Sequence, residues 1–331
     1  MSNTPLNLIR YLFILNVNSS LVWLPKWPSI ELSFVLGNTI ADQLPTTQAR
    51  PWKKALAACD LYGMKLQSEK KKRENIPESP WPIDAILFWY PVKRTYRQNE
   101  RILLELKLVG QCADHGLFLE VILPAIENIG KVTNSHWHYT NCLWGHFDIQ
   151  SIYTAQGTQW KPLVNNGHLD LRYKVNPSQW SKGLKFNTAS SNAIDRLTWL
   201  APFELKKCGI NNQQLKKTSS QKVPSITCIL EEIVQRMSSI ILGKHATCDD
   251  FLEILESDVL LSWREAMEQA SHIPLLRHNI TSAPSDMPGQ WIGSQTFATF
   301  IPTSIIPYLE FGSIFHIGKY THYGCGNFVM I

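Results

Sequence analysis

The strongest structural signal in the chain is a hydrophobic periodicity that changes from strand-like to helix-like and back in each half of the sequence. The helical stretches are 117–129 and 225–242, the second with apolar residues at regular helical spacing. The strand-like segments are 8–17, 101–109, 147–153, 197–205 and 291–300. A strand–helix–strand pattern that occurs twice predicts two α+β domains, each with an antiparallel sheet.

Three further segments complete the expected arrangement. The apolar run Ile30–Leu36 predicts a second strand near the N-terminus, and Trp52–Leu66 predicts a short helix. Cys248–Gln269 predicts another helix. A long stretch rich in glycine, asparagine and serine separates the halves, so we place an N-terminal domain at 1–160 and a C-terminal domain at 195–331.

Composition excludes several classes of protein. The 331 residues are 44% hydrophobic and 18% charged, which suits two folded domains and not a disordered chain. No apolar run approaches the roughly 18 residues of a membrane helix, and seven scattered cysteines without a CxxC pair suit reduced thiols in a cytoplasm. A net charge of +5 permits nucleic-acid binding without implying it, whereas twelve tryptophans can fill cores or stack on unpaired bases.

The most specific pattern lies in the last 43 residues, where glycines recur among aromatic residues. The segment holds a glycine-opened strand, a short helix and a glycine-rich turn around Lys319. Glycine lacks Cβ, so its backbone can approach a polyanion closely and its N–H group can meet a phosphate oxygen. The positions that make the pattern are Gly289, Gly293, Gly312, His316, Gly318, Lys319, Thr321, Gly324 and Gly326.

This ordered pattern resembles the C-terminal signature of CRISPR-associated endoribonucleases that process precursor crRNA, members of the RAMP superfamily. Weaker similarities at Glu100–Gly110 and Trp199–Leu205 follow in the expected order. The resemblance implies two tandem ferredoxin-like (RRM-like) domains with RNA laid across them. It predicts that RNA is bound by Arg277, His278, Gly312, His316, Gly318, Lys319, His322, Gly324 and Gly326.

The resemblance also implies a reaction and a set of partners. In the family a ribose 2′-OH attacks the adjacent phosphate without a metal or other cofactor, leaving a 2′,3′-cyclic phosphate and a 5′-OH. This chemistry needs a base, a proton donor and cations near the phosphate. The expected partners are a CRISPR repeat RNA hairpin, the crRNA product and other CRISPR effector subunits, with no membrane involved.

The catalytic group is where the chain departs from the family. Members commonly carry a histidine near the first helix, but this sequence has none before His115. Basic or phenolic residues near the first helix are the leading candidates, namely Lys53, Lys54 and Tyr62. Two other options stay open: a histidine elsewhere serves, or the protein is a catalytically inactive RAMP subunit that binds RNA without cutting it. For the chain as a whole, the endoribonuclease and the inactive RAMP subunit are two interpretations. A third is an unrelated α+β protein with a chance glycine-rich tail.

One further group of histidines needs an interpretation. The pattern H-x-H-x3-C-x3-H is formed by His136, His138, Cys142 and His146. This spacing matches no strong zinc pattern, so an ordinary loop and an RNA contact are both better interpretations. We therefore predict no metal site.

Overall fold

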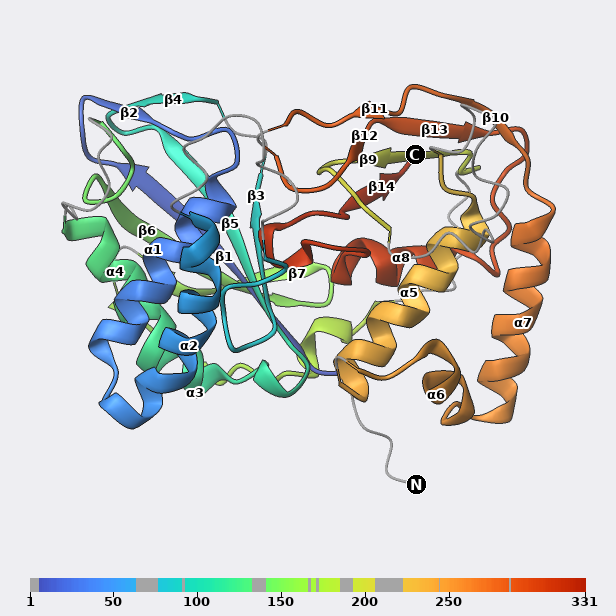
Figure 1. The fold of residues 1–331 in the computed structure, drawn as a ribbon, viewed down its shortest axis with the longest axis horizontal. Coiled ribbons are helices and arrows are strands. Elements are labelled where there is room, and N and C mark those ends of the chain that lie inside the picture. The colour runs from blue at the N-terminus through green and yellow to red at the C-terminus, as the bar shows by residue number, and fades with distance from the viewer. Residues whose placement is uncertain are drawn as a thin grey trace. The chain divides into compact units, whose positions relative to one another are not determined.

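The computed structural model describes residues 6–63, 77–90, 93–132, 141–165, 168–170, 173–184, 193–205, 223–243, 245–285 and 287–331, without the side chains of 58–63. The chain divides into two compact units, unit 1 (1–184) and unit 2 (185–331) (Figure 1). The sequence-based limits 1–160 and 195–331 stay a prediction about which segments fold independently.

Unit 1 is a mixed α/β structure around an antiparallel sheet of order β3-β5-β1-β6-β7-β8. Its first four strands have the order of a ferredoxin-like βαββαβ unit, and β7 and β8 extend that sheet. The elements are β1 (Leu8–Val17), β2 (Leu21–Trp23), α1 (Pro28–Gln43), α2 (Thr46–Gly63), β3 (Ala85–Trp89), β4 (Thr95–Arg97), β5 (Arg101–Val109), η2 (Gly110–Cys112), α3 (His115–Leu117), the π-helical turn η3 (Phe118–Ile122), α4 (Leu123–Lys131), β6 (Phe147–Gln156), β7 (Gln159–Asn165), β8 (His168–Leu169) and η4 (Gln179–Ser181).

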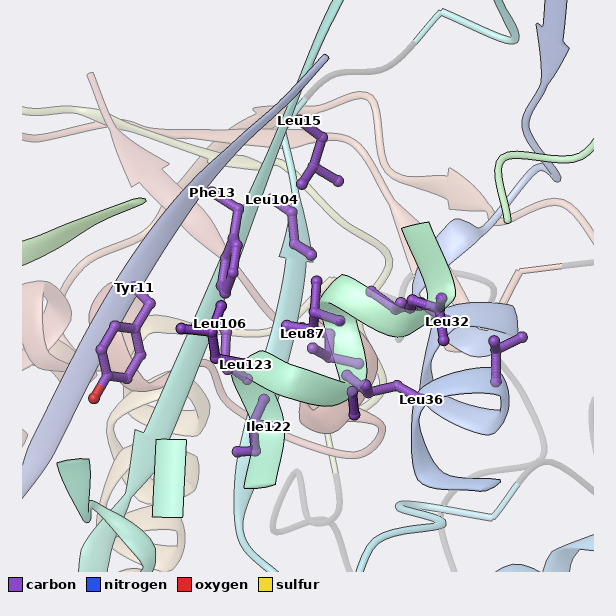
Figure 2. Packing of buried hydrophobic residues seen from close by; sticks show 14 of the residues in the cluster. Tyr11, Phe13, Leu15, Leu32, Leu36, Leu87, Leu104, Leu106, Ile122 and Leu123 are labelled. Carbon is purple, nitrogen blue, oxygen red and sulfur yellow. The ribbon is translucent and has the colours of Figure 1, made fainter. Parts of the chain in front are cut away.

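The core of unit 1 lies between one face of this sheet and its helices. Alternate residues of β1 point to opposite faces, and Tyr11, Phe13 and Leu15 are buried toward the helices. In Figure 2 these side chains belong to one cluster with Leu32 and Leu36 of α1, and Leu87 and Leu106 of the sheet lie between them. The same alternation sends the other β1 residues to the opposite face.

The predicted strand at Ile30–Leu36 is wrong, because this segment lies inside helix α1. Leu32, Val35 and Leu36 are all buried, so apolar residues surround much of the helix and its periodicity resembles that of a buried strand. A proline in the first turn, Pro28, is the sequence signal for a helix start. The predicted helix 52–66 is confirmed in type, but α2 begins earlier, at Thr46.

Unit 2 repeats the arrangement with a four-stranded antiparallel sheet of order β10-β13-β9-β14. In chain order this is again strand, helices, two strands, helix and strand, so both units have the ferredoxin-like order. The elements are β9 (Arg196–Trp199), α5 (Ile226–Ile241), α6 (Cys248–Glu253), α7 (Ser257–Ser271), β10 (Leu275–His278), β11 (Thr281–Ser282), β12 (Trp291–Ile292), β13 (Ser294–Phe297), α8 (Ile306–Phe315), η5 (Thr321–Tyr323) and β14 (Phe328–Met330). The predicted class, two tandem ferredoxin-like units with antiparallel sheets, is confirmed.

The helices of unit 2 show where sequence patterns succeed and fail. Helix α5 is capped by Ser225, whose hydroxyl accepts a hydrogen bond from the Cys228 amide at 3.2 Å. The single helix predicted at Cys248–Gln269 is instead two helices, α6 and α7. The chain leaves α6 at Ile254 and re-enters a helix after Glu256, whose backbone is extended. The sequence at this break contains neither glycine nor proline, so the break could not be predicted from a helix-breaking residue.

Candidate nucleic-acid interface

The glycine-rich loop, residues 316–327, joins α8 to β14 in unit 2. It has an unusual backbone: His316, Gly318, Tyr320, Gly324 and Gly326 all have positive φ angles between 56° and 82°. Left-handed backbone is costly for residues with a Cβ atom, so such a concentration has to be imposed by surrounding contacts. The glycine pattern that carried the resemblance therefore encodes a specific backbone path.

Two of the glycines also lie where a side chain has no room. A Cβ at Gly318 would collide with the backbone carbonyl of Glu204, and one at Gly326 would collide with the carbonyl of Ile317. The obstacles are backbone atoms, which cannot rotate away as a flexible side chain can. Both positions therefore require glycine for two independent reasons, conformation and space.

Two residues with side chains, His316 and Tyr320, also have positive φ angles, and His316 is held in place by hydrogen bonds. The ring of His316 is fully buried, with Nδ1 3.2 Å from the Cys325 carbonyl oxygen and Nε2 2.9 Å from Nδ2 of Asn327. A carbonyl only accepts, so Nδ1 carries the proton and donates, while Nε2 accepts from the Asn327 amide. Backbone strain of about 1–3 kcal/mol per residue persists only where such contacts enforce it, and it concentrates at functional sites.

A second segment, 202–205, braces the loop from outside. The Glu204 carbonyl accepts a hydrogen bond from the Lys319 amide at 2.8 Å, and the Pro202 carbonyl accepts one from the Gly326 amide at 2.9 Å. The Lys319 ammonium forms an ion pair with the Glu204 carboxylate at 2.5 Å. Two separate sequence features, Trp199–Leu205 and the glycine-rich end, thus form one structural feature.

These contacts change how the loop can meet a polyanion. We expected loop amides to be available for phosphate, but those of Lys319, Tyr323, Gly324, Cys325 and Gly326 donate to carbonyls of the protein itself. Residues 321–328 are buried, whereas residues 318–320 are partly exposed. The Lys319 side chain is 37% exposed, and its ammonium is shared with a carboxylate. The accessible part of the loop is therefore short and centred on Lys319.

The other predicted RNA-binding residues have different surroundings. Gly312 lies inside α8, where an added Cβ would come within 2.8 Å of Ile233, so close helix packing accounts for this glycine. His322 is 4% exposed, and its ring packs edge-on against Tyr323. Arg277 and His278 are exposed on β10, at the edge of the sheet. An RNA contact at each of these positions stays a prediction.

The predicted catalytic residues lie on α2 in unit 1. Lys53 and Lys54 are exposed on this helix, next to Trp52 and Leu56, which are buried in the core. Exposed ammonium groups on a helix can hold a phosphate as point charges. The side chain of Tyr62 lies outside the described residues. Catalysis by these three residues stays a prediction.

The structure also pairs two residues that the sequence did not connect, Tyr11 on β1 and His115 at the start of α3. The Tyr11 hydroxyl lies 2.9 Å from His115 Nδ1, and both rings stack with Phe118. Burial raises the pKa of Tyr11, with the nearby carboxylate of Asp114 adding to the effect, whereas burial lowers the pKa of His115 against the opposing effect of Asp114. The pair is separated by 104 positions, so no local pattern could have revealed it.

Among the described residues, no cluster of three or more His, Cys, Asp or Glu side chains is arranged to hold a metal ion. Of the histidine pattern, His136 and His138 lie outside these residues, whereas Cys142 and His146 lie within them. The Cys142 thiol lies 3.7 Å from the Trp144 carbonyl oxygen. In the part of the chain that the structure describes, no helix has the length and apolarity to cross a membrane.

Comparison with known proteins gives one clear result, at the level of the fold. No family model and no curated protein matches the sequence. Among solved structures, a chain of a partial Cas6-RT-Cas1–Cas2 complex superposes with a TM-score of 0.55 at 10% identity, covering 99% of this chain and 46% of that one. A Cas6-RT-Cas1–Cas2 complex gives 0.55 at 10% identity over 99% of this chain and 29% of the other. A Cas6 product complex gives 0.45 at 11% identity, over 98% of this chain and all of the other.

The protein is a tandem ferredoxin-like protein with a strained, glycine-rich loop before its last strand. Its fold is similar to that of chains from Cas6-RT-Cas1–Cas2 complexes, of which it spans less than half in the two matches with the higher TM-scores. The tandem ferredoxin-like fold that the glycine pattern implied is thereby confirmed.

Proposed function

We propose that the protein binds CRISPR repeat RNA and processes precursor crRNA as a Cas6-type endoribonuclease. The observation that carries this proposal is the glycine-rich loop. Its sequence resembles the family signature, it holds two non-glycine residues in strained conformations, and it belongs to a chain with a Cas6-like fold. Other CRISPR proteins are the proposed assembly partners, because the similar chains come from complexes named for Cas1 and Cas2. A cytoplasmic location fits this role.

The proposed reaction is attack of a ribose 2′-OH on the adjacent phosphate, without a metal, leaving a 2′,3′-cyclic phosphate. Lys53 and Lys54 neutralise the phosphate as charge builds up on its oxygens, and Tyr62 positions the 2′-OH or donates a proton. On a helix, Lys54 and Tyr62 are eight residues apart and differ by about 80° around the axis, and Lys53 is turned by about 100° from Lys54. Lys53 and Lys54 therefore need not act on the same phosphate.

A non-catalytic role is the second candidate function, and one observation favours it. The first two helices contain no histidine, the residue best suited to proton transfer near neutral pH. In this alternative the protein holds the RNA hairpin as a subunit of an effector complex. RNA binding is common to both candidates, whereas only the first requires strand cleavage.

Incubation of the protein with repeat RNA in EDTA, followed by analysis of the RNA ends, separates the candidates. Cleavage that leaves a 2′,3′-cyclic phosphate supports the endoribonuclease, and tight binding without cleavage supports the alternative. Lys53→Ala, Lys54→Ala and Tyr62→Phe are compared at saturating RNA with Lys182→Ala, an exposed lysine of unit 1 outside α2. We expect at least tenfold slower cleavage, about 1.4 kcal/mol, in one of the three. Wild-type rates in all three would reject this catalytic assignment.

A further inference from the structure

The sheet of unit 1 carries a group of charged and aromatic residues on the face opposite its helices. We call this group the Arg10 cluster; its members are Arg10 on β1, Tyr90 after β3, Glu105 and Lys107 on β5, and Trp160 on β7. Strand register brings them together, since Arg10 pairs with Lys107 in the β1–β5 ladder. None of these residues belongs to the glycine-rich loop or to α2.

Glu105 is the centre of the cluster. Its Oε1 atom lies 2.6 Å from Arg10 Nε and 3.9 Å from Lys107 Nζ, and its Oε2 atom accepts a hydrogen bond from the Tyr90 hydroxyl at 3.2 Å. Burial pushes the pKa of Glu105 upward, but Lys107 and Arg10 outweigh it and the pKa is lowered. The carboxylate is therefore ionised, and both of its oxygens are engaged.

Arg10 is held on two sides and open on a third. Its Nε atom is used by Glu105, and its guanidinium carbon lies 5.1 Å from the centre of the Trp160 ring. Among the described residues, Glu105 is the one side chain that accepts a hydrogen bond from Arg10, and this bond uses Nε. The two Nη groups of the guanidinium are therefore left for another acceptor. The side chain is 20% exposed, so a ligand can reach it. Arg10 is thus a pre-oriented, partly exposed cation.

Lys107 contributes a second positive charge to the cluster. Its side chain is 2% exposed, and its ammonium lies 3.9 Å from Glu105 Oε1. Burial lowers the pKa of Lys107 to about 8, even though Glu105 opposes the change. Arg10 is the more exposed of the two cations, and its guanidinium fork suits an anion with two acceptor atoms in the plane of the guanidinium.

We infer that Arg10 binds a phosphodiester of an unpaired RNA segment that lies on this face of the unit 1 sheet. The guanidinium fork matches two phosphate oxygens, and the indole of Trp160 lies near the guanidinium, with 5.1 Å between its carbon and the ring centre. This inference rests on the proposed RNA-binding function and adds a second contact region to it, remote in sequence from the glycine-rich loop.

The residues beside Arg10 favour an unpaired strand over a duplex. Leu12, Ile14 and Tyr153 are partly exposed, and Leu12 pairs with Tyr153 across β1 and β6. Apolar and aromatic surface on an open sheet face can contact the flat faces of unstacked bases while a neighbouring cation holds the backbone. In a duplex these base faces are already stacked on one another, so this surface would add little binding free energy.

The test measures binding of fluorescently labelled oligouridine to the full chain as a function of salt. We expect Arg10→Met to lower affinity about tenfold and to reduce the slope of log K against log salt by about 0.7, as loss of one phosphate contact on a single strand does. Arg10→Lys keeps the charge beside Glu105 but loses the fork, so an intermediate loss is expected. With oligouridine carrying a neutral methylphosphonate backbone, wild type and Arg10→Met should bind equally.

Arg97→Met is the matched control, because it removes an exposed arginine of unit 1 from the short strand β4. If Arg10→Met and Arg97→Met have the same affinity and salt slope, the inference is wrong while the proposed function stands. A loss that persists with the neutral backbone would also overturn it, since the contact would then be to a base. If the wild-type chain binds neither oligouridine nor repeat RNA, the proposed function itself fails. Should Arg10→Met not fold, Arg10→Lys and Trp160→Phe carry the same comparison.

Discussion

The glycine-rich loop of unit 2 and the Arg10 cluster of unit 1 build polar surfaces in opposite ways. The loop depends on the backbone: five positive φ angles, two glycines without room for Cβ, and amides that donate within the protein. The Arg10 cluster depends on side chains that project from regular strands. The loop should therefore fail abruptly when its backbone is changed, whereas the cluster should respond in graded steps to changes of charge.

The largest effect is expected from Gly326→Ala. The new methyl group would collide with the Ile317 carbonyl and occupy a left-handed conformation, so we expect a loss of about 3 kcal/mol or more in unfolding free energy. Gly243→Ala is the control: its φ is also positive, but nothing lies within 4 Å of the added atom, and about 1 kcal/mol is expected. Denaturant unfolding measures both. Equal losses of unfolding free energy in the two variants would show that the added methyl group at Gly326 does not collide with its surroundings.

A smaller, pH-dependent effect is expected from the buried lysine of the Arg10 cluster. The pKa of Lys107 falls from 10.5 to about 8 on folding, so between these values the unfolded chain binds more protons than the folded one. Stability should therefore rise with pH through this window, by about 2 kcal/mol between pH 7.5 and 9.5. Urea unfolding across this range should show the rise in wild type and its absence in Lys107→Met. The same slope in both proteins would assign the pH dependence to other groups.

The smallest effects concern the ion pair at the accessible part of the loop. Lys319→Ala should weaken binding of repeat RNA by up to about tenfold and flatten its salt dependence. Glu204→Gln removes the carboxylate that shares the Lys319 ammonium, so we expect a few-fold tighter binding. Equilibrium binding at two salt concentrations measures both changes. Tighter binding by Lys319→Ala, or weaker binding by Glu204→Gln, would contradict an RNA contact at this position.

Sequence alone predicted the parts of the fold that local patterns control. Strand β1 was predicted at 8–17 from a short apolar run, and α5 was predicted from its apolar spacing. The ferredoxin-like fold was implied by the resemblance that the glycine pattern carried. Helix α1 was missed because apolar residues surround much of it, and the break between α6 and α7 has no glycine or proline to mark it.

The side-chain sites could not be predicted, for a physical reason. Arg10 and Glu105 are 95 positions apart and meet through strand register alone, and Tyr11 and His115 meet across 104 positions. In a single sequence, a glycine in a left-handed turn is visible because few residues can replace it. An arginine on a strand, by contrast, resembles any surface arginine until its neighbours on the sheet are known.

The position of β9 in its sheet has a consequence for synthesis of the chain. This strand lies between β13 and β14, and Trp199 pairs with Phe328 near the far end of unit 2. A ribosome that adds 5–20 residues per second needs on the order of 10 s to travel between those two positions. Until β13 is made, both edges of β9 lack their final partners, and the edge that β14 will occupy stays open for the whole interval. An open edge can pair with strands of other nascent chains. Unit 2 therefore has a longer period of vulnerability to misassembly than a fold whose neighbouring strands are consecutive in sequence.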